Sequence, residues 1–386
     1  MRGDEYMEEN RSAENPGTEE KACWHWFLGI PISYIGQRKL LKYFKTPGKV
    51  MEASESQITQ IIGKTQTGVE YLEDSRNKDF RKAYLELAKR GIRLTLRGET
   101  GYPAALLPFP DAPLGLYHIG ELPGNEICVG IVGARSCSRY GLEMAAALGR
   151  ALADAGVAVV SGMARGIDGA GQWAALECGG SSFAVLGSGV DVCYPGENRA
   201  LYERLKKEGG VISEFPPGSA PHAWHFPVRN RIISGLSKAL VVVEAREKSG
   251  SLITAELALE QGKDIYAVPG RVTDALSRGC NELIRSGAGI VISPAAFLEE
   301  LDMFYSKKEK KSKKSSIRLA EKENLVYSGL DLTPKSAETI SNETGLSMAE
   351  VMELLVSLQL KGLAVEDGIG YYALAEGKNS ADDKRG

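Results

Sequence analysis

The sequence predicts an α/β fold: a parallel sheet covered by helices on both faces, with a small helical domain before it and a winged helix after it. Short apolar runs alternate with helical patterns between residues 127 and 292. Strands of a parallel sheet are buried on both faces, so they read as continuous apolar runs, and helices join them. Glycine-rich turns adjoin these runs, as expected where strands end and helices begin.

The chain divides into segments of different composition. The first residues are polar and mostly acidic, and a run of lysines separates the sheet from a last helical region. The predicted segments are a disordered leader (1–21), a helical domain (22–98), the sheet domain (99–305), a basic linker (306–316), a winged helix (317–375) and a disordered tail (376–386).

Before the sheet, apolar residues at three-to-four spacing predict helices in 34–44 and 80–88, and Pro47 and Gly48 end the first of them. The segment 101–124 is rich in proline and glycine, so we expect an irregular connector with a short extended piece at 116–118.

Within the sheet domain the apolar runs predict strands and the segments between them predict helices. The expected strands are 127–132, 157–160, 183–186, 211–212, 240–243, 265–268 and 290–292. The expected helices are 140–155, 167–178, 198–208, 230–236, 251–261 and 280–286.

After the lysine run, two helical patterns and a final hairpin pattern predict a winged helix. Ser347 followed by Glu350 has the spacing of a capping box, which predicts the start of the second helix.

Composition excludes several classes of protein. The 386 residues carry a formal net charge of −3, and no apolar stretch approaches the roughly 20 residues needed to span a bilayer. The N-terminus has no apolar core typical of a signal peptide, so we expect a cytoplasmic protein without a membrane contact. The six cysteines form no CxxC pair, which predicts neither disulfides nor a metal site. There is no P-loop, and the single GxG at 187–189 lacks the dinucleotide fingerprint, so no cofactor is expected.

The turns at the strand ends predict a site for phosphate groups. Arg135 follows the first strand of the sheet, where parallel sheets bind ligands, and its planar fork suits a phosphate. Arg229 and Arg231 flank Asn230 at a predicted helix start, where basic residues oppose the helix dipole and anion contact is the better explanation. The turn 249–251 offers hydroxyl and N–H groups to an anion. Asp168 could cap the second helix of the sheet domain or orient Arg135, and capping or internal pairing is expected ahead of a chemical role.

Taken together, these turns resemble the DNA-processing protein A family, also called DprA or Smf, which acts in bacterial natural transformation. The stretches that carry the resemblance are Gly133–Ser136 with Tyr140–Gly141, Ser161–Asp168, Ala184–Pro195, Phe226–Leu236, Ser249–Ala255, Ala267–Gly270 and Asn281–Ile284. The resemblance covers residues 128–291 firmly and the flanking domains more loosely.

The resemblance implies an extended Rossmann-like domain with an N-terminal domain of the SAM or helix-hairpin-helix type. It also implies a homodimer that binds single-stranded DNA and loads the RecA recombinase onto it, without catalysis. Arg135 would lie in the DNA pocket, with Arg229 and Arg231 along the same groove. The residues predicted to contact nucleic acid are Gly133, Arg135, Ser136, Ser138, Gly162, Met163, Ala164, Gly187, Ser188, Gly189, Arg229, Asn230, Arg231, Ser249, Gly250 and Ser251.

The sequence departs from the family at one position, because Gln172 stands where many relatives have a histidine. For base stacking the sequence offers Tyr140, Tyr194, Phe215 and Phe226, each of which could equally pack in the core.

Two alternative functions remain open. One is a nucleotide phosphoribohydrolase resembling the LOG enzymes, although their glycine-rich Pro-Gly-Gly-x-Gly-Thr turn is replaced here by 248–254, with Glu256 beyond it. The other is a transcription factor, which the lack of arginine in the expected recognition helix 347–360 disfavours.

Overall fold

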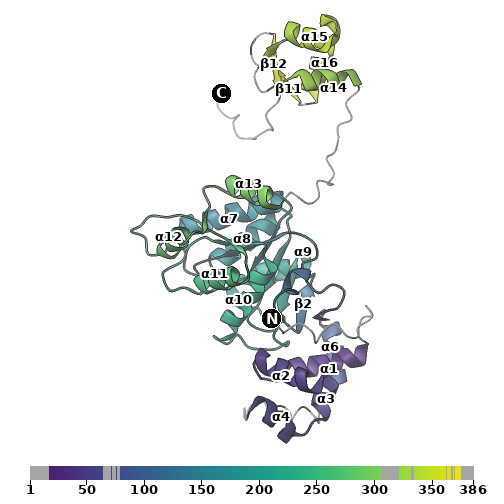
Figure 1. Ribbon diagram of the computed structural model, residues 1–386, viewed down its shortest axis with the longest axis vertical. Coiled ribbons are helices and arrows are strands. Elements are labelled where there is room, and N and C mark those ends of the chain that lie inside the picture. The colour runs from purple at the N-terminus through teal and green to yellow at the C-terminus, as the bar shows by residue number, and fades with distance from the viewer. Residues whose placement is uncertain are drawn as a thin grey trace. The chain divides into compact units, whose positions relative to one another are not determined.

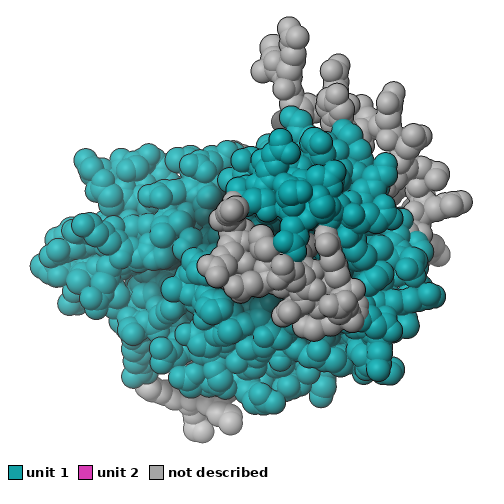
Figure 2. Space-filling model, turned by 90° about the horizontal axis from the view of Figure 1, so that it is seen from below, with its two compact units in different colours: residues 1–305 teal, residues 306–386 magenta. Residues whose placement is uncertain are grey.

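The computed structural model describes residues 17–63, 71, 75, 79–305, 321–331, 334–361, 363–366, 368 and 370–374. The chain forms two compact units, residues 1–305 and residues 306–386. Figure 2 shows one face of the first unit in teal. The expected linker and tail, and residues 1–16 of the expected leader, lie outside the described residues.

A nine-stranded sheet forms the centre of the described part of the first unit, in the order β1-β2-β6-β5-β4-β3-β7-β8-β9. The strands are β1 (Arg93–Leu96), β2 (Gly115–Gly120), β3 (Cys128–Val132), β4 (Ala158–Ser161), β5 (Ser182–Val185), β6 (Gly210–Ser213), β7 (Ala239–Val242), β8 (Asp264–Ala267) and β9 (Gly289–Ile290). Strands β3 to β9 pair in parallel with one another, whereas β2 is antiparallel to both β6 and β1. The predicted parallel sheet is confirmed and gains an antiparallel edge.

Helices cover both faces of this sheet (Figure 1). On one face lie α7 (Arg139–Asp154), α8 (Ile167–Glu177) and α13 (Pro294–Tyr305), and α9 (Arg199–Glu208) packs beside α8. On the other lie α10 (His225–Leu236), α11 (Gly250–Glu260) and α12 (Arg278–Arg285). The side chains of β3 alternate accordingly: Val129 and Ile131 pack with the first group, and Cys128 and Val132 with the second.

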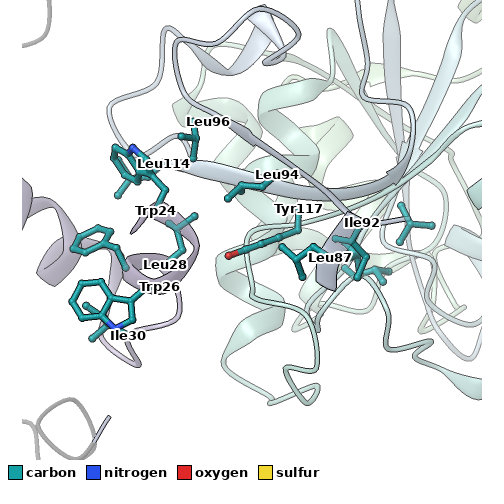
Figure 3. Close-up of a cluster of buried hydrophobic side chains, with 14 of the residues drawn as sticks. Trp24, Trp26, Leu28, Ile30, Leu87, Ile92, Leu94, Leu96, Leu114 and Tyr117 are labelled. Atoms are coloured by element: carbon teal, nitrogen blue, oxygen red, sulfur yellow. The ribbon is translucent and has the colours of Figure 1, made fainter. Parts of the chain in front are cut away.

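The N-terminal helices share a core with the antiparallel edge. They are α1 (Thr18–Leu28), α2 (Tyr34–Phe44), α3 (Pro47–Glu52), α4 (Glu55–Ile62) and α6 (Phe80–Lys89). Figure 3 shows Trp24 and Leu28 of α1 beside Leu94 and Leu96 of β1, and all four are buried in one cluster. Two single turns of 3-10 helix, η1 (Ala104–Leu106) and η2 (Gly196–Asn198), complete the connections.

Several elements differ from the sequence prediction. Residues 93–96 were expected inside the helical domain but form β1, in which only Leu94 and Leu96 are buried. A short strand with one buried face is easily taken for the end of a helix. Helix α13 was not predicted, and α1 begins at Thr18, inside the expected leader. Helix α10 begins at His225 rather than at Asn230, because a proline is accepted in the first turn of a helix, where its missing N–H has no partner to lose.

The second unit has the predicted winged-helix pattern. Its elements are α14 (Glu321–Gly329), β10 (Lys335–Ser336), α15 (Ala337–Thr344), α16 (Met348–Leu360), β11 (Ala364–Glu366) and β12 (Tyr371–Leu374). Val326, Ile340, Val351 and Leu355 belong to its core. The predicted capping box is confirmed: the Glu350 N–H donates to Ser347 Oγ at 3.4 Å, and the Ser347 N–H donates to Glu350 Oε2 at 3.1 Å.

None of the helices that the structure describes combines the length and apolar character needed to cross a bilayer.

Candidate nucleic-acid interface

A pocket of about 620 Å³ opens where β3 and β7 end. From β3 the chain moves outward through β4, β5 and β6, then returns to place β7 on the other side of β3. Open α/β sheets bind ligands in the crevice at such a reversal of strand order. The pocket is lined by 132–136, Ala164, Asp168, Phe226, Pro227, Arg229, Asn230, Ile233, Arg246, 248–251, Ile253, Thr254 and Leu276.

The structure brings many of the predicted residues together around this pocket. They come from the turn after β3, the turn before α8, the first half of α10 and the start of α11. These residues are Gly133, Arg135, Ser136, Ala164, Arg229, Asn230, Ser249, Gly250 and Ser251.

Two arginines lie against one aromatic ring in the pocket. The Cζ atom of Arg135 is 5.1 Å from the centre of the Phe226 ring, and that of Arg229 is 5.9 Å from it. Both distances are within the range of cation–π attraction. Arg135 is exposed, and no residue that the structure describes forms a hydrogen bond or ion pair with it. Its guanidinium donors therefore remain available to a ligand, and the ring fixes where they lie.

Arg229 is a buried cation, with only 4 % of its surface exposed. Its Nη1 donates to the carbonyl oxygens of Gly162, at 3.0 Å, and Val185, and its Nε donates to Asn230 Oδ1 at 3.2 Å. Burial lowers the pKa of Arg229 to about 10, and the negative charge of Asp168 opposes that shift. Arg229 thus ties α10 to the ends of β4 and β5 and places positive charge beneath the pocket.

Asp168 pairs internally, as predicted. Its Oδ2 accepts a hydrogen bond from the Gly162 N–H at 3.1 Å, and burial raises its pKa although Arg229 acts in the opposite direction. Its charge therefore balances Arg229 rather than Arg135, the second partner considered in the sequence analysis.

The opposite wall is the start of α11. Its first residues have no acidic side chain, and Ser249, the N-cap, accepts no capping hydrogen bond. The Ser249 and Ser251 hydroxyls lie 2.8 Å apart. The unpaired N–H groups at a helix start and the positive end of the helix dipole would attract an anion.

Arg246 and Lys248 also line this wall and are exposed, yet the sequence analysis did not select them. The signal was present, since two basic residues precede the serine-glycine turn that was selected. The pocket therefore carries four basic side chains and one carboxylate among its described lining residues.

The predicted contacts of Gly187, Ser188 and Gly189 with a ligand are not supported, because these residues are buried outside the pocket lining. The Ser188 hydroxyl donates to the Val192 carbonyl at 3.1 Å, and the Gly189 N–H donates to the Ser219 carbonyl at 2.9 Å. The Ser188 hydroxyl and the Gly189 N–H therefore stabilise the turn after β5.

Three further predicted residues have structural partners and lie outside the pocket lining. The Ser138 hydroxyl caps α7, accepting from the Gly141 N–H at 3.1 Å, and it donates to the buried Glu244 at 2.5 Å. The Gly162 carbonyl and N–H bond to Arg229 and Asp168 as described above. Met163 is buried and adopts a φ of 53°, a conformation that non-glycine residues rarely adopt.

Arg231 does not line the groove, contrary to the sequence prediction. Its Nη2 donates to both carboxylate oxygens of Glu214 at 2.6 Å, and its guanidinium carbon lies 5.4 Å from the centre of the Tyr34 ring in α2. Residues two apart on a helix point in nearly opposite directions, so α10 can turn only one of the two arginines into the pocket.

Gln172, the departure from the family pattern, is fully buried and satisfied. Its Oε1 accepts from the Met163 N–H at 3.0 Å, and its Nε2 donates to the Phe183 carbonyl at 3.1 Å and to Ser182 Oγ at 3.2 Å. It joins the turn after β4 to β5, which is a structural task.

The aromatic residues proposed for stacking separate into two groups. Phe226 lines the pocket, and Tyr194 lies beside it with ring centres 5.7 Å apart. Phe215 stacks on His225 at 3.8 Å, and the Tyr140 hydroxyl donates to the Pro269 carbonyl at 3.3 Å. Across the described part of the chain, no three His, Cys, Asp or Glu side chains are grouped so that they could hold a metal ion.

Comparison with protein families gives two matches. The model of the DNA recombination-mediator protein A family matches residues 93–302. This range contains all the described strands of the sheet, β1 to β9, and the entire pocket lining. A second model, the DprA winged helix domain, matches residues 310–367.

Individual relatives agree with these matches. The DNA processing protein DprA of Streptococcus pneumoniae is 43 % identical over 202 residues, which cover 52 % of this chain and 71 % of the relative. The Smf protein of Escherichia coli is 38 % identical over 287 residues, covering 71 % of this chain and 75 % of the relative.

Two solved structures are also similar. The X-ray structure of DprA from Streptococcus pneumoniae has a TM-score of 0.63 and 34 % identity, over 74 % of this chain and 99 % of that one. DNA processing protein A from Helicobacter pylori, whose structure was described for its single-stranded DNA binding mode, has a TM-score of 0.50 and 27 % identity, over 55 % and 97 % of the two chains. On the match to more than half of its length, this chain belongs to the DNA recombination-mediator protein A family.

Proposed function

We propose that this protein binds single-stranded DNA in the pocket between β3 and β7, protects it and delivers it to a recombinase. The observation that carries the proposal is the group formed by Arg135, Phe226 and Arg229 in a pocket that the start of α11 also lines. The binding mode described for the Helicobacter pylori relative supports the choice of ligand.

The chemistry of the pocket fits a single strand better than a duplex. Non-specific single-strand binding combines positive charge along the backbone with an aromatic surface for the unpaired bases. Arg246 and Lys248 supply exposed charge in the pocket lining, and Phe226 supplies a half-buried ring. A base within a duplex is stacked on its neighbours and could not reach this ring without being unpaired.

We also propose that the protein delivers the strand to RecA, forms a homodimer, acts in natural transformation and is located in the cytoplasm. These proposals rest on the family membership and its resemblance to DprA and Smf proteins. A recombination mediator needs a partner that takes over the strand, and RecA is the recombinase that the resemblance implies.

We further propose that the pocket binds without catalysis. The phosphoribohydrolase alternative requires a glutamate at the reacting centre. Among the described lining residues the carboxylate is Asp168, which is buried and opposed by Arg229, whereas Glu256 lies outside the lining. Incubation with AMP or CMP should release no free base, and release at a rate proportional to protein concentration would restore the enzymatic alternative.

The test is a fluorescence anisotropy titration of a labelled oligo-dT with the full chain, its Arg135→Glu variant and an Arg139→Glu control. Arg139 is 91 % exposed, lies four residues away and pairs with Glu143 at 2.7 Å, so the control changes charge equally outside the pocket lining. We expect Arg135→Glu to lower affinity at least about 100-fold, because it removes a cation and adds a repelling charge. Equal affinities of the two variants would disprove the pocket assignment.

A further inference from the structure

An apolar stripe runs along the exposed side of α16 in the second unit. Met348, Met352, Val356 and Leu360 follow one another at intervals of four residues, and they are 44 %, 38 %, 49 % and 85 % exposed. Residues four apart lie on one side of a helix. The core of the unit uses a different side, through Val351, Leu355 and Leu358. We call the four exposed residues the α16 stripe.

The α16 stripe is unsuited to nucleic acid. Helix α16 contains no lysine or arginine, and residues 321–374 carry three lysines against nine carboxylates, a net charge of −6. Each of these lysines is already paired: Lys322 with Glu350 at 2.7 Å, Lys335 with Glu343 at 2.9 Å and Lys361 with Glu323 at 2.5 Å. Phosphates would meet repulsion and no available cation.

We propose that the α16 stripe is a docking surface for a protein partner that presents an amphipathic helix with lysine or arginine beside its apolar face. Four apolar side chains in line, extending about 18 Å along α16, match the face of a second helix. Two of them are methionines, whose flexible side chains adapt to a partner's surface. Exposed Glu353 beside the stripe, and the acidic unit as a whole, select a basic partner.

Charge also argues against the other occupants. A second copy would bring two units of net charge −6 face to face, with Glu353 of each beside the shared stripe. The basic run 307–314 of the same chain has the opposite charge but no apolar side chain with which to cover the stripe. The α16 stripe lies in the second unit and the pocket in the first, so the test of the stripe does not depend on DNA binding in the pocket.

The probe is an 18-residue peptide of leucine and lysine arranged with helical periodicity, with a leucine–glutamate peptide of the same pattern for comparison. Binding of each labelled peptide to the full chain is measured by anisotropy. We expect the lysine peptide to bind at least about tenfold more tightly than the glutamate peptide. The absence of binding by the lysine peptide would overturn the proposal.

A double variant, Met352→Glu with Val356→Glu, separates docking from simple charge attraction. The added carboxylates would strengthen a purely electrostatic attraction for lysines, whereas docking on the stripe should weaken about tenfold or more because charged groups replace the buried apolar contact. Val365→Glu on β11, where the side chain is 44 % exposed, adds charge outside α16 and should leave affinity unreduced.

Leu360→Glu serves as a second variant, because this last residue of α16 is 85 % exposed and its replacement does not disturb the core. It should also weaken binding of the lysine peptide. Unchanged or stronger binding in both variants would refute the docking surface. Sedimentation that shows a dimer dissociated by these substitutions would instead assign the stripe to a second copy of the chain.

Discussion

Phe226 lies against two of the arginines that line the pocket, Arg135 and Arg229. Its ring lies close to Arg135 and Arg229, and Gly187 packs against it so tightly that an added Cβ would lie 3.0 Å from the ring. The ring therefore positions the exposed guanidinium of Arg135 and offers a surface for a base. Both effects serve binding of a single strand, and neither involves a chemical step.

Phe226→Leu should lower affinity for oligo-dT about tenfold or more, because a base that stacks on an aromatic ring gains roughly 1–3 kcal/mol. Phe215→Leu is the matched control, since Phe215 stacks on His225 and lies outside the pocket lining. Anisotropy titrations of both variants measure the difference. If Phe226→Leu bound as tightly as Phe215→Leu, the ring would have no part in binding.

Substitutions of Gln172 show whether the departure from the family pattern changes stability or DNA binding. Gln172→His keeps one donor and one acceptor and should fold and bind single-stranded DNA like the unaltered protein. Gln172→Leu leaves the buried Met163 N–H without its acceptor, at a cost of about 1–3 kcal/mol in the free energy of unfolding. Urea unfolding of both variants measures this cost. Equal stability of the two would contradict the structural role.

At the scale of residues, the sequence predicted the positive charge of the pocket better than it predicted which residues line it. Arg135 and Ser249 could be placed because each follows a strand whose end was clear from its apolar run. Arg231 was misplaced because the direction of a helical side chain depends on where the helix lies over the sheet, which no local pattern gives. Gly187–Gly189 lie outside the pocket lining, because the turn that they form is buried and the Gly189 N–H pairs within the protein.

At the scale of elements, the half-buried His25 and the buried His118 hold the antiparallel edge of the sheet. The His25 Nδ1 of α1 lies 2.8 Å from the Tyr117 hydroxyl of β2. The His118 Nδ1 of β2 donates to the Gly120 carbonyl at 3.0 Å, and its Nε2 lies 3.1 Å from the Thr95 hydroxyl of β1. Burial lowers the pKa of both histidines to about 4.

This edge should weaken in mild acid. The folded state holds both histidines neutral down to about pH 4, whereas the unfolded chain protonates them below about pH 6.5. The unfolded state therefore binds more protons between these values, and stability falls as pH falls through this window. We expect each histidine to reduce the free energy of unfolding by about 2 kcal/mol between pH 7 and pH 5.

Urea unfolding at both pH values, with His118→Gln for comparison, measures this dependence. The pH dependence of the variant should be smaller by about 2 kcal/mol between pH 7 and pH 5, because the contribution of His118 is gone. An identical pH dependence in the variant would show that His118 is not responsible.

The elements that the sequence predicted and those that it missed differ in burial. The strands β3 to β7 are buried along their whole length and β8 over its last two residues, and they stand out as apolar runs. Strand β1 has one buried face and four residues, too few for its alternation to be recognised. The start of α10 was placed too late, at residue 230, whereas Pro227 stands in the first turn of the helix, where proline is accepted.

At the scale of the whole molecule, the pocket belongs to the first unit. All of its lining residues lie between 132 and 276, and the second unit begins at 306. Each unit has its own buried core among the described residues. The order of strands and the division into units follow from long-range pairing, so the sequence could indicate the parallel sheet but not the reversal between β3 and β7.

A chain ending at residue 305 should therefore bind oligo-dT with nearly the affinity of the full chain. Anisotropy with both proteins tests this, with circular dichroism as the control for folding. Loss of binding by a well-folded truncated chain would mean that the second unit contributes to the DNA site.

The most direct test of the central proposal is to map where a single strand lies. The full chain is irradiated in complex with an oligo-dT that carries 4-thiothymine, and the attached peptides are identified by mass spectrometry. We expect crosslinks to the pocket, at or beside Phe226 and in the turns 133–136 and 246–251, and their loss in Arg135→Glu. Crosslinks that fall in the second unit, or that persist unchanged in this variant, would contradict the proposal.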